Sequence, residues 1–126
     1  MPDDLSVRDD SSIDDEELLW RRISPEHVVS DSDGTRRPSS AAFSDSSDST
    51  PLSVDLASIA GDPSVTLESH SGFGLAELVV ADVRKLGLGV WPDPLPHNEA
   101  HAGITGRKTR GTRRALARVA RWRVEP

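Results

Sequence analysis

The chain has 126 residues, no cysteine and a formal net charge of −6, which fits one domain at most on a length prior of roughly 150 residues. The lack of cysteine excludes disulfides, thiolate zinc sites, iron–sulfur clusters and a thiol nucleophile. No apolar run approaches the roughly 18 residues of a membrane span, and the acidic start MPDDLSVRDD is unlike a signal peptide. We therefore expect a cytoplasmic protein, and the excess of arginine over lysine, 13 to 2, favours a bacterial origin.

The charge is divided unequally between the two halves of the chain. Residues 1–63 carry 15 acidic and 5 basic side chains, whereas residues 64–126 carry 6 acidic and 10 basic ones. The first 15 residues hold six aspartates and three serines with little apolar mass, so burial cannot offset the entropy lost on ordering them. The sequence predicts a disordered acidic tail over residues 1–16 and a single compact domain over residues 17–126.

The first half of this domain alternates short apolar runs with polar turns. Residues 18–23 (LLWRRI) predict a strand with Trp20 pointing inward, and Ser24 before a proline is typical of a capped helical turn. Gly34 predicts a turn that needs a positive φ. Residues 52–57 (LSVDLA) alternate apolar and mostly polar side chains, which predicts a strand with one buried face.

The second half predicts three further strands (LAELVV, LGVWP and AHAGIT), with a short helix (ADVRKLG) that ends at Gly87. Three prolines within residues 92–96 exclude regular structure from the loop before the third strand. Residues 112–122 predict an amphipathic helix, capped by Thr112, with an apolar arc opposite an arginine stripe. Together these elements predict the α+β class: a small mixed sheet with short helices on one side and an amphipathic basic C-terminal helix.

Six short motifs follow one another over Leu18–Trp122: RRI with a nearby proline, SSAAF, LSV, RKLG, DPLP and HA. In this order they resemble the motifs of an uncharacterised group of small bacterial proteins. The resemblance implies one complete domain and brings no activity and no catalytic residue with it.

The stretch DPLPHNEAHAGI contains His97 and His101, four residues apart, with Glu99 between them. Histidines at this spacing form zinc pairs on helices, but the prolines exclude a helix here, and no metal site is predicted. We expect His97 to lie in a solvated loop and His101 to enter a strand that fixes its ring. His101 is therefore the better candidate for acid–base chemistry.

An arginine, a serine pair and a glutamate also follow one another along the chain, at Arg21/Arg22, Ser39/Ser40 and Glu77. This layout resembles that of ADP-ribosyltransferases, in which the arginine holds the pyrophosphate, the serine orders the nicotinamide side and the glutamate stabilises the ribosyl cation. The alternative is that the arginines flank a strand and the serines form a turn. The catalytic candidates are His101, Arg22 and Ser40, and no cofactor is predicted.

The densest signal is basic: eight basic residues and no acidic one occupy the 17 positions of Arg107–Arg123. Such a run favours an anionic partner, either an acidic protein surface or nucleic acid. The alternatives are a solvated helix face or neutralisation by the acidic tail. The anion-binding candidates are Arg107, Arg110, Arg114, Arg118 and Arg121.

Taken together, the sequence predicts a small interaction or accessory protein that binds a protein partner and does not catalyse a reaction. One alternative is a small enzyme acting on a nucleotide-like substrate, either ADP-ribosyltransferase-like or histidine-dependent. The other is nucleic-acid binding through the basic C-terminal helix. No association with a membrane is expected.

Overall fold

The computed structural model describes residues 6–47 and 50–126, so residues 1–5 of the predicted tail lie outside the described part. In chain order the strands are β1 Leu18–Ile23, β2 Val28–Ser30, β3 Arg36–Pro38, β4 Leu52–Leu56, β5 Gly74–Val79, β6 Gly89–Pro92, β7 His101–Thr105 and β8 Arg121–Val124. The α-helices are α1 Ala57–Ala60, α2 Pro63–Thr66, α3 Val80–Lys85 and α4 Arg110–Val119, and the 3-10 helices are η2 Pro25–His27 and η3 Ser40–Phe43.

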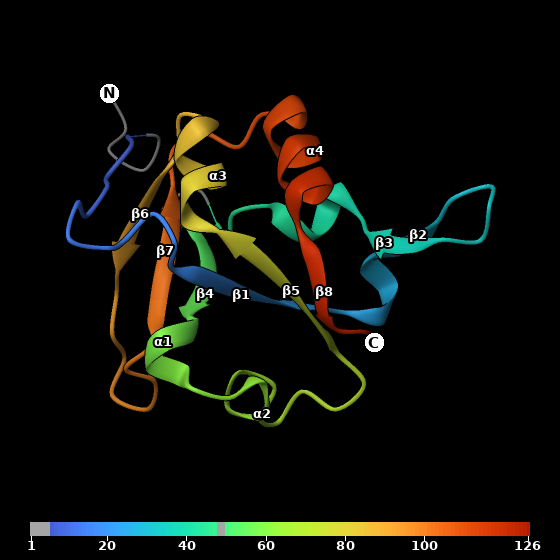
Figure 1. Ribbon diagram of the computed structural model, residues 1–126, viewed down its shortest axis with the longest axis horizontal. Coiled ribbons are helices and arrows are strands. Elements are labelled where there is room, and N and C mark those ends of the chain that lie inside the picture. The colour runs from blue at the N-terminus through green and yellow to red at the C-terminus, as the bar shows by residue number, and fades with distance from the viewer. Residues whose placement is uncertain (1–5, 48–49) are drawn as a thin grey trace.

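Six strands form the main sheet in the order β6-β7-β4-β1-β5-β8, and β2 pairs with β3 in a separate hairpin (Figure 1). All pairings between strands of the described residues are antiparallel. The α+β class is therefore confirmed, but the prediction of a mixed sheet is wrong, because every described pair of neighbouring strands runs antiparallel.

One face of the sheet carries the hydrophobic core. Alternate residues of β1, β4, β5, β6 and β7 belong to this core together with residues of α3, α4 and η3. Phe43 of η3 and Leu116 of α4 are fully buried, and burying a side chain of this size contributes about 1.5–3 kcal/mol. The core therefore holds α4 and η3 on the same side of the sheet.

The opposite face of the sheet holds polar groups and is covered in part by α2. Asp55 of β4 is 4% exposed, and its carboxylate accepts hydrogen bonds from Thr66 Oγ1 of α2 and from Asn98 Nδ2, each at 2.8 Å. Trp20, which pairs with Asp55 across the sheet, is buried here and donates from Nε1 to Glu77 at 3.0 Å. The prediction of helices on one side is wrong, because Asp55 gives α2 a hydrogen-bonded anchor on this second face.

The C-terminal helix begins and ends earlier than the sequence predicts. Thr109, not Thr112, is its cap, since Thr109 Oγ1 accepts from the Thr112 amide at 3.1 Å. Trp122 belongs to β8, where it pairs with Ala76 of β5. Residues 121–124 alternate arginine with apolar side chains, which is the period of a strand, and over one turn this pattern also fits a helical arc.

Residues 8–17, named the acidic strap here, contact β7, β6 and α3, and the disorder of residues 1–16 stays a prediction. Arg8 exchanges two hydrogen bonds with Thr105 of β7: the amide donates to Thr105 Oγ1 at 2.8 Å, and that hydroxyl donates to the Arg8 carbonyl at 2.6 Å. The Asp10 amide donates to the Val90 carbonyl at 2.9 Å. The strap thus covers the outer edge of β6, which would otherwise offer unpaired backbone groups.

Arg84 of α3 forms ion pairs and hydrogen bonds with several residues of the acidic strap. Arg84 binds the carboxylates of Asp15 (2.6 Å) and Asp9 (3.2 Å) and donates to the carbonyls of Asp10 and Ile13, both at 2.9 Å. The two carboxylates, that of Asp15 foremost, raise the pKa of Arg84 above its ordinary value. Among the described residues, the carboxylates of the strap pair with Arg84 and with none of the C-terminal arginines, so neutralisation of those arginines by the tail stays a prediction.

Candidate anion-binding groove

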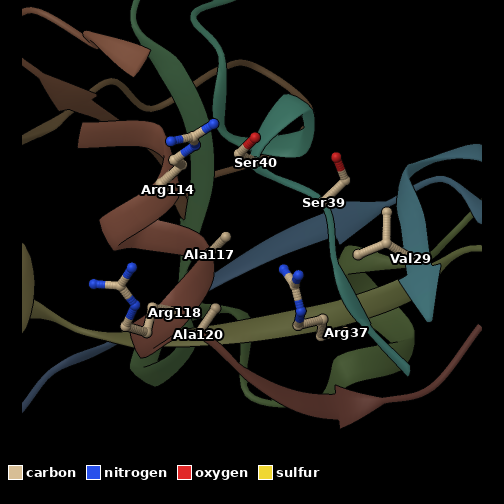
Figure 2. A pocket seen from close by; sticks show the side chains of 8 residues that line it. All are labelled: Val29, Arg37, Ser39, Ser40, Arg114, Ala117, Arg118 and Ala120. Carbon is tan, nitrogen blue, oxygen red and sulfur yellow. The ribbon is translucent and has the colours of Figure 1, made fainter. Parts of the chain in front are cut away.

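A groove of about 510 Å³ opens between α4 and the chain that runs from the β2–β3 hairpin into η3. Figure 2 shows its two walls. The α4 wall is formed by Arg114, Ala117, Arg118 and Ala120, and the hairpin wall by Val29, Arg37, Ser39 and Ser40.

Among the described residues, three arginines and no carboxylate line this groove. Arg37 binds Asp31 through Nε, at 3.0 and 3.2 Å from its two carboxylate oxygens, which leaves both Nη groups available. Arg114 and Arg118 are exposed and, within the described part of the chain, make no ion pair and no side-chain hydrogen bond. The groove therefore carries two positive charges that the fold does not balance.

Two serine hydroxyls contribute to the hairpin wall. Ser39 caps η3, and its Oγ accepts from the Ala41 amide at 3.2 Å, so the hydroxyl hydrogen remains free to donate. Ser40 Oγ has no hydrogen-bond partner in residues 6–47 and 50–126. Hydroxyl and guanidinium groups can donate to the same anion.

The two walls are tied together at both ends of α4. Before the helix, Lys108 Nζ donates to Asp45 Oδ1 at 2.8 Å and to two main-chain carbonyls. After the helix, Trp122 Nε1 donates to the Arg36 carbonyl at 3.0 Å. The Lys108 side chain is 3% exposed, and burial lowers the pKa of Lys108 below its ordinary value although Asp45 opposes this shift. Walls fixed in this way lower the entropy lost when a ligand binds.

The structure separates the predicted anion-binding residues. Arg114 and Arg118 lie one turn apart on the same side of α4 and line the groove. Arg107 and Arg110 lie in the loop before the helix and at its first residue, and they do not line the groove. Arg121 belongs to β8 and is also outside it.

Arg37 and Ser39 are groove residues that the anion-binding prediction missed. They lie far from α4 in the sequence, and proximity arises only when η3 packs against the helix. The available signal was the run RRPSS at 36–40, which combines guanidinium and hydroxyl donors within five residues.

The three predicted catalytic residues do not meet. Ser40 lies in the groove, on the core side of the sheet, whereas His101 and Arg22 lie on the opposite face. His101 and Arg22 line a cavity of about 10 Å³ together with Asp55, which is about the size of one water molecule. Arg22 Nη1 is already bonded to the Thr66 carbonyl at 3.2 Å.

The arginine–serine–glutamate layout is not assembled either. Arg21 donates to the carbonyls of Ala42 and Ser53, both at 3.0 Å, and so joins β1 to η3 and β4. Burial, with repulsion by Arg22, lowers the pKa of Arg21 to about 10. Glu77 lies on the opposite face of the sheet, away from the two serines. These residues crosslink the fold and do not surround one pocket.

His101 is oriented by the loop that precedes β7. Its Nδ1 lies 2.9 Å from the Asp93 carbonyl oxygen and 3.3 Å from the Asp93 carboxylate. Because a carbonyl only accepts, Nδ1 holds the proton of the neutral ring and Nε2 is the acceptor. His97 and Glu99 are exposed. The described residues contain no group of three side chains that could hold a metal ion.

Comparison with known proteins gives no relative: no family model, curated protein or solved structure matches the chain. The resemblance to a group of small bacterial proteins therefore stays a prediction. In the part of the chain that the structure describes, no helix has the length and apolar character needed to cross a membrane.

Proposed function

We propose that the protein is a non-catalytic interaction protein of the bacterial cytoplasm that binds an acidic segment of a protein partner in the groove beside α4. The observation that carries this proposal is the pair Arg114 and Arg118, which line the groove without a counter-ion among the described residues. By contrast, Arg84 and Lys108 each pair with a carboxylate of the fold. Unbalanced charge in a preformed groove favours a partner of opposite charge.

The lining of the groove favours a peptide over nucleic acid. Ala117 and Ala120 are small, and no described residue that lines the groove is aromatic, so bases would find no ring on which to stack. Trp122 is half-buried against the core and donates its Nε1 to the Arg36 carbonyl.

Nucleic-acid binding is the second candidate, and the spacing of the arginines on α4 favours it. Arg110, Arg114 and Arg118 follow one another at intervals of four residues, which aligns them along one side of the helix. Such a row could contact successive phosphates. This candidate requires Arg107 and Arg110, whereas the peptide proposal does not.

The test measures the affinity of a short labelled glutamate-rich peptide by fluorescence anisotropy at about 20 mM salt, where screening is weak. We expect the wild-type protein to bind, and Arg114→Glu and Arg118→Glu each to lower the affinity about tenfold or more. The matched control, Arg107→Glu, makes the same charge change outside the groove and should bind like the wild type.

Two results would count against this function. One is the absence of peptide binding by the wild type at low salt. The other is an equal loss of affinity in Arg114→Glu and Arg107→Glu, which would mean that net charge alone attracts the peptide. Tighter binding of a DNA duplex of equal charge, weakened by Arg107→Glu, would favour the nucleic-acid candidate.

A further inference from the structure

The groove offers more hydrogen-bond donors than one carboxylate can accept. Arg114 and Arg118 each present a guanidinium without a partner among the described residues, and Arg37 keeps both Nη groups next to its bond with Asp31. Ser40 adds a hydroxyl that has no partner in the described chain. A carboxylate has two acceptor oxygens, whereas a phosphate monoester has three.

The charge of the groove also matches a phosphate. Arg37 is offset by Asp31, so Arg114 and Arg118 leave two positive charges unbalanced. A phosphorylated side chain carries about −1.5 to −2 at pH 7, whereas a single Asp or Glu would leave one of the two charges uncompensated.

The basic side chains of the groove are of the type that phosphate recognition favours. All are arginines, and neither of the two lysines of the chain lines the described groove. The planar guanidinium binds two oxygens of a phosphate at once, which a lysine ammonium cannot do.

The size and floor of the groove fit a phosphorylated aliphatic side chain with its neighbouring backbone. Its volume of about 510 Å³ lies within the roughly 300–1,000 Å³ range of ligand sites and exceeds what a phosphate alone would fill. Ala117 and Ala120 give the α4 wall small apolar surfaces. Because no aromatic side chain is among the described lining residues, the phenyl ring of a phosphotyrosine would have no stacking partner.

We propose that the acidic partner segment carries a phosphoserine or phosphothreonine, whose phosphoryl group binds between Arg37, Arg114 and Arg118 with Ser40 as a further donor. This inference rests on the proposed function, since it concerns the same groove and the same class of partner.

The test compares three labelled peptides that differ only at the central residue, which is serine, glutamate or phosphoserine, within the same acidic flanks. We expect the phosphoserine peptide to bind about tenfold or more tightly than the glutamate peptide, and the serine peptide to bind most weakly. Inorganic phosphate should displace the phosphoserine peptide at lower concentration than chloride does.

Two substitutions separate phosphate recognition from general attraction. Arg118→Lys keeps the charge but removes the planar guanidinium that binds two oxygens at once. It should therefore weaken binding of the phosphoserine peptide more than binding of the glutamate peptide. Ser40→Ala removes one hydrogen-bond donor and should lower the affinity for the phosphoserine peptide alone, by about threefold to tenfold. Arg107→Lys, outside the groove, should change neither affinity. Unchanged thermal unfolding would show that each variant is folded.

The outcomes distinguish this inference from the proposed function. Equal affinities for the glutamate and phosphoserine peptides would overturn phosphate recognition and leave binding of acidic segments intact. Failure of all three peptides to bind would overturn both. A DNA duplex that displaces the phosphoserine peptide at equal charge concentration would reassign the groove to nucleic acid.

Discussion

The acidic strap beside β6 and the arginine groove beside α4 are two charged regions of the molecule, and their side chains differ in whether they pair within the fold. The strap places Asp9 and Asp15 on Arg84, so two of its six acidic side chains are paired with an arginine of the fold. The groove leaves Arg114 and Arg118 without a carboxylate in the described chain. The comparison teaches that charge density along a sequence does not identify a binding surface. What identifies it is charge that both remains after the fold has made its own pairs and lines a groove.

We expect the largest loss of stability from a charged residue near the groove that pairs within the fold. Lys108→Met should lower the free energy of unfolding by about 3 kcal/mol, because it leaves Asp45 and two carbonyls without their buried partner. Urea denaturation measures this loss. Lys85→Met is the matched control, since Lys85 is exposed on α3 and its substitution should cost at most about 0.5 kcal/mol. Similar losses in both variants would show that the Lys108–Asp45 pair does not hold the groove walls together.

A substitution at Gly89 tests whether the strap packs against the edge of β6. A Cβ there would collide with the Arg8 carbonyl oxygen and lie 2.9 Å from Thr105 Oγ1, so Gly89→Ala must push the strap off β6. We expect a loss of about 1–3 kcal/mol in unfolding free energy and faster hydrogen exchange at the Asp10 amide.

A second glycine provides the control. Gly111→Ala meets its nearest atom at 3.9 Å in the first turn of α4 and should stabilise the protein by up to about 1 kcal/mol. If Gly89→Ala were equally harmless, the strap would not be seated on β6 as the hydrogen bonds indicate.

Arg84 binds two carboxylates and two main-chain carbonyls of the strap. Arg84→Met should lower the unfolding free energy by about 1–2 kcal/mol, since its bonds to two carbonyls are partly buried while its two ion pairs are largely exposed and screened. Amide exchange at residues 9–13 should speed up while exchange in α4 stays unchanged. The unfolding free energy of Arg84→Lys should lie between those of the wild type and Arg84→Met, because an ammonium cannot reach all four acceptors. Unchanged exchange in the strap would indicate that backbone pairing with β6 suffices to hold it.

Sequence patterns predicted the elements whose residues alternate or form apolar runs. The strands β1, β4, β5, β6 and β7 and the helix α3 are confirmed in this way. The hairpin β2–β3 and the edge strand β8 were missed, because each of these strands is only three or four residues long, which is too short to show a clear period, and each depends on a partner strand. The contacts of the strap with the edge of β6 and with Arg84 were not predicted either, because composition alone encodes neither partner.

The candidate site was predictable only in part. Arg114 and Arg118 came from the density of arginine, but the same density also selected Arg107 and Arg121, which lie outside the groove. The sequence did not predict Arg37 as a groove residue, because Arg37 comes near α4 only when η3 packs into the core. The predicted grouping of His101 with Ser40 failed because a sheet separates them, and alternation along a strand does not say which face a distant loop will cover.

The smallest effect has the most informative sign. Arg114 and Arg118 are like charges one turn apart on α4, an arrangement that destabilises a helix by about 0.2–0.5 kcal/mol. Arg118→Gln should therefore stabilise the free protein by about that amount, most clearly at low salt, while it weakens binding of the acidic peptide. Removing an arginine would thus stabilise the molecule at the groove and destabilise it at the strap. A loss of stability above about 1 kcal/mol in Arg118→Gln would place Arg118 with Arg84 among the residues that hold the fold, and the groove would then have no surplus charge to offer a partner. If the groove is a binding surface, Arg118→Gln should raise stability and lower affinity together, because Arg114 and Arg118 repel each other in the free protein and are compensated only by the ligand.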